Sequence, residues 1–454
     1  MEQPEKNKIY EIEIKDVSSD GNGVGTVDGF AVFVSGTVTG DIVSALIVKV
    51  QKRYAYAKVL EIIKPSSYRK EAECSAFKKC GGCSLMHIDY NYQLEIKKGI
   101  IENALSRIGG ITHGVDEMIG ADEAFRYRNK MIFPVGEDKA GAPLCGFFRE
   151  RSHDIIPLDD CLLGDEINAR VILAIKEHMK KYSILAYDEK SHKGVIRKIF
   201  TRKGAVSGEV MVLISANAEE IAKKEELVQK LCEISPLIVS IILNVNKKRT
   251  NLVLGDKNIV LFGRERISDT LCGAEYEISA HSFYQINHTQ TEKLYKKALE
   301  YADISKDDTV MDIYCGIGTI SLYAAKKAKK VIGVEIVPQA IADAKENAKR
   351  NGIYNAEFYC ADAEELVPRL ISKGISPDVV ILDPPRKGSD ESTLSAIKKA
   401  KPERVVYVSC NPATLARDLK FLEDAYKVTK VSGVDMFPNT NHVETVCLMS
   451  RKEK

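Results

Sequence analysis

Two apolar, β-branched runs near the C-terminus constrain the fold of this chain most strongly. Val379–Leu382 and Val405–Val408 each end abruptly in polar residues that are followed by a proline. Such runs are typical of buried parallel strands in a sheet that helices cover on both faces. Asp383 follows the first run directly, and Cys410 comes just after the second. Because ligands of open α/β sheets bind just beyond the carboxyl ends of the strands, we expect both side chains in one site.

The same alternation of strands and helices extends over residues 285–454. Further strands are expected at Thr309–Ile313, Val331–Val334, Glu357–Tyr359, Val428–Val434 and Val443–Met449. Helices are expected at His288–Tyr301, Thr319–Lys327, Gln339–Arg350 and Ala413–Leu422. This spacing predicts a doubly wound, Rossmann-like α/β domain with a parallel sheet, to which we assign residues 281–454.

Cys410 lies directly before one of these predicted helices. Asn411 can cap the helix and Pro412 can occupy its first position. The positive end of the helix dipole is expected to lower the pKa of the thiol and so favour a nucleophilic thiolate. The alternative is an ordinary buried cysteine, which position alone would favour. The neighbouring motifs favour the nucleophile.

A glycine turn opens the predicted domain, in the segment DIYCGIGTISL. Gly316 and Gly318 let the backbone approach a ligand at a helix N-terminus. Glu335, at the next strand end, suits ribose hydroxyls, and Asp362, after the third strand, would lie near an adenine. Ser321 stands where a dinucleotide site needs a third glycine, which favours S-adenosylmethionine (SAM) over NAD. The alternative is a glycine turn without a ligand.

Residues 1–68 have a different pattern, with short alternating runs broken by Gly, Asp and Asn. This pattern predicts a small β-barrel or sandwich. Around its last strands seven cations face one acid, Glu61; they are Lys49, Lys52, Arg53, Lys58, Lys64, Arg69 and Lys70. Tyr54 and Tyr56 lie among them, a combination that suits single-stranded RNA. A solvated strand face with two packed tyrosines is an equally good interpretation.

Three cysteines form a C-x5-C-x2-C cluster at the start of the segment 69–280. They are Cys74, Cys80 and Cys83, and Cys161 is the best candidate for a fourth ligand. Four thiolates fit either Zn²⁺ or a 4Fe–4S cluster, and three clustered cysteines with one remote partner favour iron–sulfur. Spacing alone does not exclude zinc.

The rest of the segment 69–280 predicts a mixed, β-rich domain with a helix near Glu219–Cys232. Arg126, Arg128 and Lys130 occupy alternate positions of an expected strand, so they should share one face. Such a face can bind phosphates, or it can protect an edge strand from pairing.

Net charge, hydrophobic content and cysteine count exclude few functions. A net charge of +2 neither supports nor excludes nucleic acid. The charged N-terminus argues against secretion, and no apolar run is long enough to span a membrane. Eleven cysteines, an odd number, favour a reducing cytoplasm over a disulfide scaffold.

Five motifs, in order, resemble those of the RNA uracil-5-methyltransferases. They are SFYQIN (Ser282–Asn287), DIYCGIGT, LDPPRKG (Leu382–Gly388), YVSCNPATLARD (Tyr407–Asp418) and HVETV (His442–Val446). The first module resembles a TRAM domain, an OB-like barrel that binds RNA. Together with the cysteine cluster it is similar to the branch that acts on 23S rRNA and carries a 4Fe–4S cluster. The resemblance leaves tRNA as an alternative substrate, and a non-catalytic RNA-binding or assembly factor is the alternative of another class.

The resemblance also implies roles for individual residues. Cys410 is similar to the nucleophile and Glu444 to the general base, while Cys74, Cys80, Cys83 and Cys161 are similar to the cluster ligands. The residues expected around the methyl donor or the target base are Gln285, Tyr314, Gly316, Gly318, Thr319, Glu335, Asp362 and Asp383. Thr319 stands where many relatives have asparagine. Arg386, Arg128 and Lys130 are expected to contact RNA, and the protein is expected to act as a monomer.

The chemistry of uracil accounts for these residues. Its C5 is a poor nucleophile, and attack of a thiolate on C6 moves electron density to C5, which can then accept a methyl group. Asp383 could hold the base edge and Arg386 could stabilise the enolate oxygen. Glu444, expected to be ionised at neutral pH, would remove the C5 proton. The target base must leave its stack to reach such a site.

Overall fold

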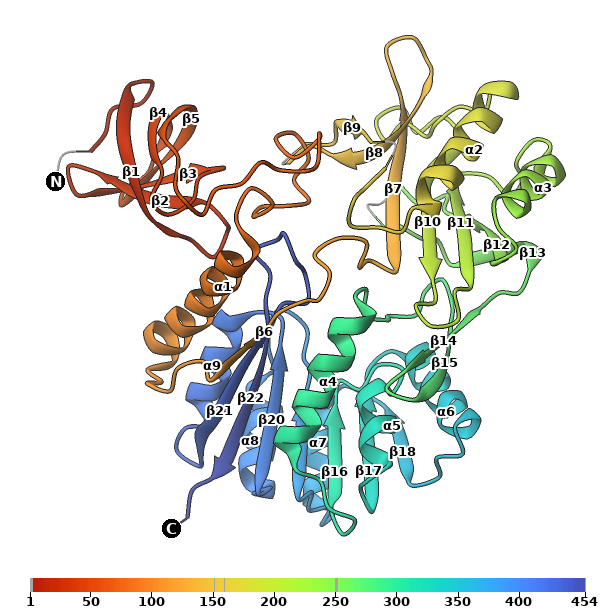
Figure 1. Ribbon diagram of the computed structural model, residues 1–454. Helices are drawn as coiled ribbons and strands as arrows, with labels where there is room; N and C mark the ends of the chain where they lie inside the picture. The colour runs from red at the N-terminus through yellow and green to blue at the C-terminus, as the bar shows by residue number, and fades with distance from the viewer. Residues whose placement is uncertain (1–2, 151, 159, 250–251, 454) are drawn as a thin grey trace.

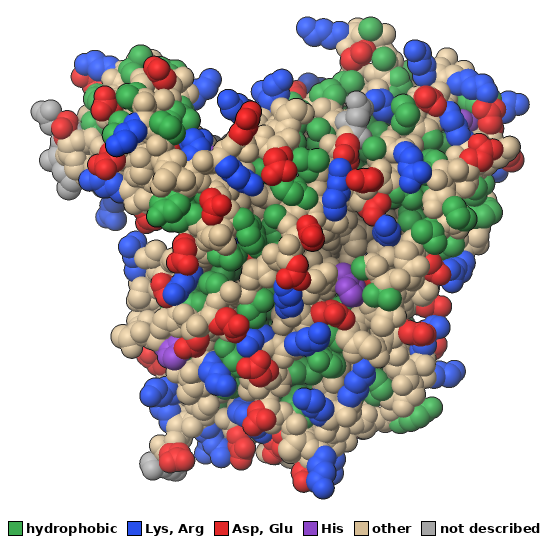
Figure 2. All heavy atoms as spheres, viewed as in Figure 1, with side chains coloured by type: hydrophobic (Ala, Val, Ile, Leu, Met, Phe, Trp, Pro, Cys, Tyr) green, Lys and Arg blue, Asp and Glu red, His purple; other side chains and the backbone are tan. Residues whose placement is uncertain are grey.

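The computed structural model describes residues 3–453 apart from residues 151, 159, 250 and 251, so the outermost residues of the first and last expected domains lie outside it. The chain folds around a closed five-stranded barrel, a seven-stranded sheet and an eight-stranded sheet, and a short two-stranded hairpin lies between the two sheets (Figure 1). Within the described residues no helix is long and apolar enough to cross a membrane. Basic and acidic side chains are interspersed over the face drawn in Figure 2, in keeping with the small net charge.

The N-terminal strands close into a barrel, which confirms the predicted β module. Its strands are β1 (Ile9–Val17), β2 (Gly23–Val27), β3 (Phe30–Ser35), β4 (Ile42–Val50) and β5 (Tyr54–Lys64). The barrel closes where β1 pairs with β4, and alternate residues such as Ile12, Val43 and Ile47 fill its interior. Tyr54 and Tyr56 contact each other edge to face, with ring centroids 5.6 Å apart, as packed tyrosines do.

The C-terminal sheet has the predicted doubly wound form. Its order is β18 (Ala356–Cys360), β17 (Lys330–Glu335), β16 (Thr309–Ile313), β19 (Val379–Leu382), β20 (Arg404–Ser409), β22 (Glu444–Arg451), β21 (Tyr426–Val434) and β6 (Glu117–Ile119). One face packs against α4 (His288–Ala302), α5 (Thr319–Ala325) and α6 (Pro338–Arg350). The other packs against α7 (Ala363–Ser372), α8 (Glu391–Ala400) and α9 (Pro412–Leu422). Because successive residues of a strand face opposite ways, both faces of β19 are apolar and all four of its residues are buried.

This sheet differs from the prediction in one strand direction and in the origin of one strand. Strand β22 runs antiparallel to both of its neighbours, β20 and β21. Strand β6 comes from the segment 69–280, yet it pairs in parallel with β21 at the sheet edge. Helix α1 (Tyr90–Ala104), from the same segment, packs beside α9 (Figure 1). Three residues without an apolar pattern give no local signal, so β6 depends on backbone pairing with a strand that is distant in sequence.

The central sheet is mixed, as predicted. Its order is β13 (Lys257–Gly263), β12 (Ile238–Val245), β11 (Val210–Ala216), β10 (Ile196–Lys203), β7 (Lys130–Glu137), β8 (Pro143–Phe148) and β9 (Ile155–Pro157). Helices α2 (Ile167–Lys181) and α3 (Lys224–Ile234) accompany it, and the hairpin of β14 (Ile267–Leu271) and β15 (Ala274–Ile278) follows it. Helix α3 overlaps the predicted helix, whereas α2 was not predicted.

The prediction that Arg126, Arg128 and Lys130 share one strand face is wrong. Strand β7 begins only at Lys130, and Arg126 has a left-handed backbone with φ of 55°. Arg126 instead forms an ion pair of 2.6 Å with Asp160. The loop before β7 turns to meet the segment around Cys161, a contact that alternation in the sequence could not reveal.

Candidate active site

Asp383, Cys410 and Glu444 lie together beyond the carboxyl ends of the parallel strands in the C-terminal sheet. Strands β19 and β20 are parallel neighbours with Leu382 opposite Tyr407, so the residues that follow them lie side by side. This confirms the expected proximity of Asp383 and Cys410. Strand β22 is antiparallel to β20, and Thr445 lies opposite Ser409. Glu444, the first residue of β22, therefore lies next to the end of β20. An antiparallel strand thus delivers a carboxyl group from its amino end to the same edge.

The environment of Cys410 raises the pKa of its thiol to about 11, contrary to the expected lowering. Partial burial is the largest cause, and the carboxyl groups of Glu444 and Asp383 add to it, while Arg386 opposes them. The predicted helix start is nevertheless confirmed, since Asn411 caps α9 and Pro412 is its first residue. Desolvation and two nearby acids therefore outweigh the helix dipole in the unliganded protein.

Burial and nearby charges also raise the pKa values of the Glu444 and Asp383 carboxyl groups. Burial raises the pKa of Glu444 to about 8, and Asp383 adds to the rise while Arg386 opposes it. The expectation that Glu444 is ionised at neutral pH is therefore wrong for the free protein, because its side chain is 4% exposed. Burial, and then Asp312, raise the pKa of Asp383 to about 7. Proximity of like charges and loss of water act together here.

Arg386 lies on an exposed loop that helix α9 holds in place. Its carbonyl oxygen accepts hydrogen bonds from Asn411 Nδ2 at 3.1 Å and from Thr414 Oγ1 at 3.3 Å. Gly388 closes the loop with a left-handed backbone (φ of 80°) and donates its N–H to the Pro385 carbonyl. From this fixed backbone the guanidinium lies close enough to Cys410 and Glu444 to lower the pKa values of both.

The glycine turn forms the expected cradle beside this edge. Gly316 and Gly318 both have left-handed backbones, and Gly318 precedes α5. The Gly316 N–H donates to Glu335 Oε2 at 3.2 Å, which fixes Glu335 at the end of β17. A side chain at Gly318 would come within 3.2 Å of the Phe358 ring, so only glycine leaves this turn undisturbed. A glycine turn that a ligand can approach closely, next to a glutamate that can bind ribose hydroxyls, fits a SAM site.

The other residues predicted around the donor border this turn or lie at the ends of nearby elements. Tyr314 has a left-handed backbone and its hydroxyl lies 3.0 Å from Ser389 Oγ. Thr319 Oγ1 donates to the Tyr295 hydroxyl at 3.2 Å. Asp362 caps α7 by accepting the Glu364 N–H, which leaves its second oxygen for a ligand. Gln285 is partly buried, and its carbonyl accepts a hydrogen bond of 2.9 Å from Asn129.

Asp312 is a buried acid of this site to which sequence reasoning assigned no role. It is fully buried, accepts a hydrogen bond of 2.5 Å from Ser321 Oγ, and has no described partner for its Oδ1. Burial raises its pKa to about 7. Its position in the motif DIYCGIGT was visible, but its effect on Asp383 depends on the pairing of β16 with β19.

The four predicted cysteine ligands lie near one another. Burial raises the pKa of Cys83 to about 12, and Cys161, Cys80 and Cys74 each add to the rise. All four are free thiols. Within the described residues, no three His, Cys, Asp or Glu side chains already stand in a metal-binding geometry. Four thiols that lie close enough to affect one another's pKa values have the donor atoms of a four-thiolate site.

The predicted RNA contacts Arg128 and Lys130 are both partly buried, and only Lys130 belongs to strand β7. Burial lowers the pKa of Lys130 to about 8, and Arg202 and Arg128 lower it further. Arg128 lies near the cysteines, since its charge lowers the pKa values of Cys80 and Cys161. These two cations therefore do not form an exposed strand face.

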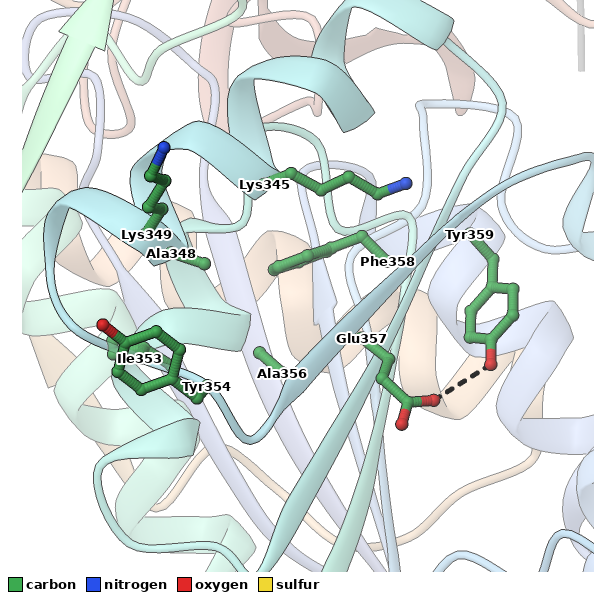
Figure 3. A pocket seen from close by; sticks show the side chains of 9 residues that line it. All are labelled: Lys345, Ala348, Lys349, Ile353, Tyr354, Ala356, Glu357, Phe358 and Tyr359. Carbon is green, nitrogen blue, oxygen red and sulfur yellow. Dashed lines mark hydrogen bonds between the residues drawn. The ribbon is translucent and has the colours of Figure 1, made fainter.

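A cavity of about 560 Å³ lies between α6 and β18 (Figure 3). Side chains of α6 and β18 line it, including Lys345, Lys349, Tyr354 and Phe358. None of the predicted site residues is among them.

Comparisons with known proteins agree with this geometry. The family model described as tRNA (Uracil-5-)-methyltransferase matches residues 89–452, and that of the TRAM domain matches residues 3–60. A protein of Halalkalibacterium halodurans named an uncharacterized RNA methyltransferase is 47% identical over 98% of both chains. A relative of the same description from Clostridium tetani is 47% identical over 98% of this chain and 97% of its own.

A solved structure shares nearly the whole fold. It is the tRNA (uracil-54, C5)-methyltransferase of Pyrococcus abyssi in complex with S-adenosyl-L-homocysteine, 28% identical with a TM-score of 0.78 over 97% of this chain and 99% of that one. The match covers the barrel as well as both sheets. The chain therefore belongs to the SAM-dependent RNA (uracil-5-)-methyltransferase family and carries an N-terminal TRAM domain.

Proposed function

We propose that this protein methylates C5 of a uridine in 23S rRNA through a covalent bond between Cys410 and C6 of the base. The observation that carries the proposal is the meeting of Cys410, Glu444 and Asp383 at one sheet edge beside the glycine turn. C5 methylation requires a nucleophile, a general base and a group that holds the edge of the uracil. Cys410, Glu444 and Asp383 are candidates for these three roles and lie close enough to affect one another's pKa values.

The reaction divides into balanced steps. The Cys410 thiol gives its proton to water, and the thiolate forms a bond to C6 while electron density moves to C5 and the adjacent carbonyl oxygen. Bound SAM supplies the methyl group that C5 then accepts. Glu444 removes the proton from C5, the C5–C6 double bond re-forms, and the C6–S bond breaks to release the thiolate.

The electrostatics of the site suit each role. A carboxyl group with a pKa of about 8 is a stronger base than an ordinary glutamate once it is ionised, and its pKa lies near working pH. Arg386 lowers the pKa values of both Cys410 and Glu444, so it favours the thiolate and can stabilise the enolate oxygen. Asp383, protonated in part near pH 7, can both donate to and accept from the edge of a uracil.

We further propose that Cys74, Cys80, Cys83 and Cys161 hold a closed, structural 4Fe–4S cluster. Their proximity and the partial burial of all four support a four-thiolate site. Such a cluster supplies no chemistry to the reaction; it ties the loop at Cys161 to the segment after the barrel. A thiolate centre of this kind fits a protein of the reducing cytoplasm. We also propose that the protein acts as a monomer.

Two observations favour the tRNA alternative. The family model that matches residues 89–452 is described as tRNA (Uracil-5-)-methyltransferase, and the fold is similar to that of a solved tRNA (uracil-54, C5)-methyltransferase. Incubation with methyl-labelled SAM and 23S rRNA fragments beside tRNA, followed by nucleoside analysis, decides between them. Label in 5-methyluridine of rRNA alone supports our proposal, and label in tRNA alone contradicts it.

The covalent step has its own test. RNA that contains 5-fluorouridine should form an adduct that survives denaturation, because fluorine cannot be removed from C5 as a proton is. Absence of this adduct with both rRNA and tRNA would contradict the mechanism.

A further inference from the structure

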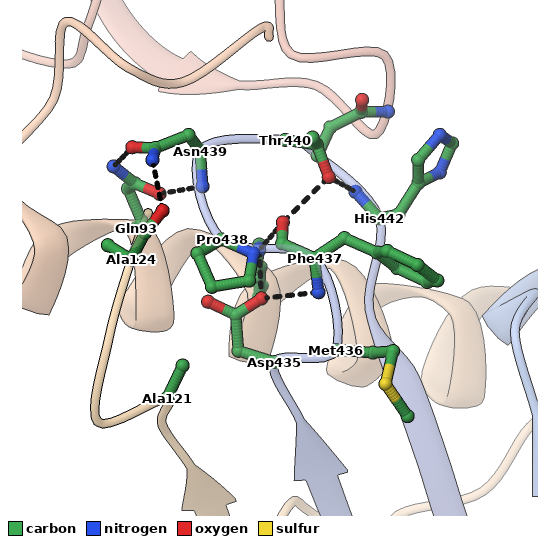
Figure 4. A network of polar contacts seen from close by, with 12 residues as sticks. Gln93, Ala121, Ala124, Asp435, Met436, Phe437, Pro438, Asn439, Thr440 and His442 are labelled. Atoms are coloured by element: carbon green, nitrogen blue, oxygen red, sulfur yellow. Dashed lines mark hydrogen bonds and ion pairs between the residues drawn. The ribbon is translucent and has the colours of Figure 1, made fainter. Parts of the chain in front are cut away.

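The loop that leads into Glu444 is held at both of its ends. This loop, residues 435–443 between β21 and β22, is called here the base-bearing loop. At its start Asp435 forms a fully buried ion pair of 2.5 Å with Lys97 of α1, whose ammonium also donates to the Phe437 carbonyl. In its middle Asn439 exchanges hydrogen bonds with Gln93 of α1 and donates to the Ala124 carbonyl (Figure 4).

Near its end, the loop is held by the N-terminal part of the chain. Asn441 Oδ1 accepts from Ser84 Oγ at 3.0 Å, and the Asn441 N–H donates to the same hydroxyl at 2.9 Å. Asn441 Nδ2 donates to the Ser19 carbonyl of the barrel at 2.6 Å. One side chain therefore joins the barrel, the residue after Cys83, and a loop position three residues before Glu444.

Close packing at this junction requires a glycine on the barrel side. Gly21 has a left-handed backbone, and a side chain there would come within 2.9 Å of Ser84 Cβ and 3.5 Å of Asn441 Cβ. The barrel turn that contains Ser19 and Gly21 thus packs directly against the side chains of Ser84 and Asn441. Among the described residues of the base-bearing loop, Asn441 makes the hydrogen bond to the barrel.

We propose that Asn441 is a positioning residue that ties the orientation of Glu444 to the barrel. The inference rests on the proposed function, since it concerns the step in which Glu444 removes the C5 proton. When the barrel binds RNA, its turn at Ser19 fixes Asn441, and with it the strand start that carries Glu444. The step before it, attack by Cys410, uses a side chain that directly follows β20 and lies outside the base-bearing loop.

The two steps predict a distinctive defect for Asn441→Ala. With an ordinary uridine substrate the variant should attach to RNA and accept the methyl group but release product slowly, so a methyl-labelled protein–RNA adduct accumulates on denaturing gels. A displacement of a catalytic group by about 1 Å can reduce its rate on the order of 100-fold, so we expect turnover to fall between about 10-fold and 100-fold. The KM for RNA should fall together with kcat, because a covalent adduct that accumulates before a slow release step lowers both.

Asn441→Asp separates the two arms of the junction. A carboxylate can still accept from Ser84 Oγ, but it cannot donate to the Ser19 carbonyl. If the barrel link is what positions Glu444, this variant should accumulate adduct as Asn441→Ala does. Wild-type behaviour of Asn441→Asp would overturn the link to the barrel.

Asn351→Ala is the matched control. Asn351 also bridges distant segments, since it accepts the Glu275 N–H and donates to the Glu275 carbonyl, both at 2.8 Å, at a place remote from the site. It should show no adduct with ordinary RNA. Equal adduct in the two alanine variants, or a raised KM with unchanged kcat in Asn441→Ala, would overturn the proposal.

Failure of the proposed function is distinguishable from failure of this inference. Wild-type protein with 5-fluorouridine RNA tests the covalent mechanism alone, because that adduct forms without proton removal. Asn441→Ala should form the 5-fluorouridine adduct at the wild-type rate, which also shows that the variant is folded and binds both substrates. Loss of that adduct in the variant would contradict the separation of the two steps.

Discussion

Replacing Glu444 with glutamine should slow turnover and stabilise the folded protein, and the gain in stability should grow with pH. The side chain is 4% exposed, and burial is the main cause of the rise in its pKa from the ordinary 4.5 to about 8. The folded protein therefore holds a proton that the unfolded chain releases near pH 4.5. Glutamine has nearly the same shape and no proton to release.

The magnitude follows from the shift in pKa. An acid whose pKa rises on folding makes the folded state less stable as pH increases from the unfolded to the folded pKa, and the penalty is constant above that. At about 1.4 kcal/mol per pKa unit, a rise from 4.5 to about 8 gives a full penalty of about 5 kcal/mol. About 2 kcal/mol of it is already present at about pH 6, which leaves an increase of about 2 to 3 kcal/mol between about pH 6 and about pH 8.5.

Urea unfolding followed by circular dichroism at these two pH values measures the effect. The free energy of unfolding of Glu444→Gln minus that of the wild type should be larger at the higher pH. Glu346→Gln, at an exposed position of α6, is the control and should show no such difference. A stability difference between Glu444→Gln and wild type that is the same at both pH values would refute the reasoning.

The same substitution tests the role in turnover. Loss of a general base typically costs on the order of 100-fold to 10,000-fold in rate, and the variant should accumulate adduct with ordinary uridine RNA. In the wild type, turnover should rise as pH increases through about 8, because only the ionised carboxylate accepts a proton. A turnover that is flat from about pH 6 to about pH 9 would contradict this role.

Four further outcomes are expected. Cys410→Ser should fold normally but form no adduct with 5-fluorouridine RNA, as denaturing gels would show. Wild-type protein purified without oxygen should contain about four irons and absorb at about 400 nm, and Cys83→Ser should lose both signals; zinc in place of iron would contradict the cluster. Gly318→Ala should weaken SAM binding in calorimetry, because its backbone is left-handed and the new side chain meets Phe358 at 3.2 Å. Lys97→Met should lower the free energy of unfolding by about 3 to 5 kcal/mol, because it leaves the buried Asp435 carboxylate without its partner, and urea unfolding measures this.

Short-range patterns in the sequence predicted the main features of the candidate site. The apolar runs before Asp383 and Cys410 could be read as neighbouring buried strands, and the capped helix after Cys410 has the predicted start. The glycine turn likewise carries its own signal, because left-handed backbone favours glycine wherever it occurs. Each of these features depends on about ten consecutive residues, so no knowledge of distant contacts was needed.

The pKa values of the site were not predictable in this way. The helix start after Cys410 suggested a lowered thiol pKa, and the carboxyl group of Glu444 suggested an ionised base. Both expectations failed because Glu444 enters from an antiparallel strand and lies buried beside Asp383 and Cys410. Local sequence states which groups can ionise, whereas desolvation depends on which other segments cover them.

The sequence by itself thus determined the strands, the turns and the identity of the reactive groups, because these follow from local hydrophobic periodicity and backbone preference. Only the tertiary structure decided that β6 joins the C-terminal sheet, that α1 packs beside α9, and that Asn441 meets the barrel. Such contacts join residues hundreds of positions apart. They arise because burial of apolar surface and satisfaction of backbone hydrogen bonds are properties of the whole chain rather than of any one segment.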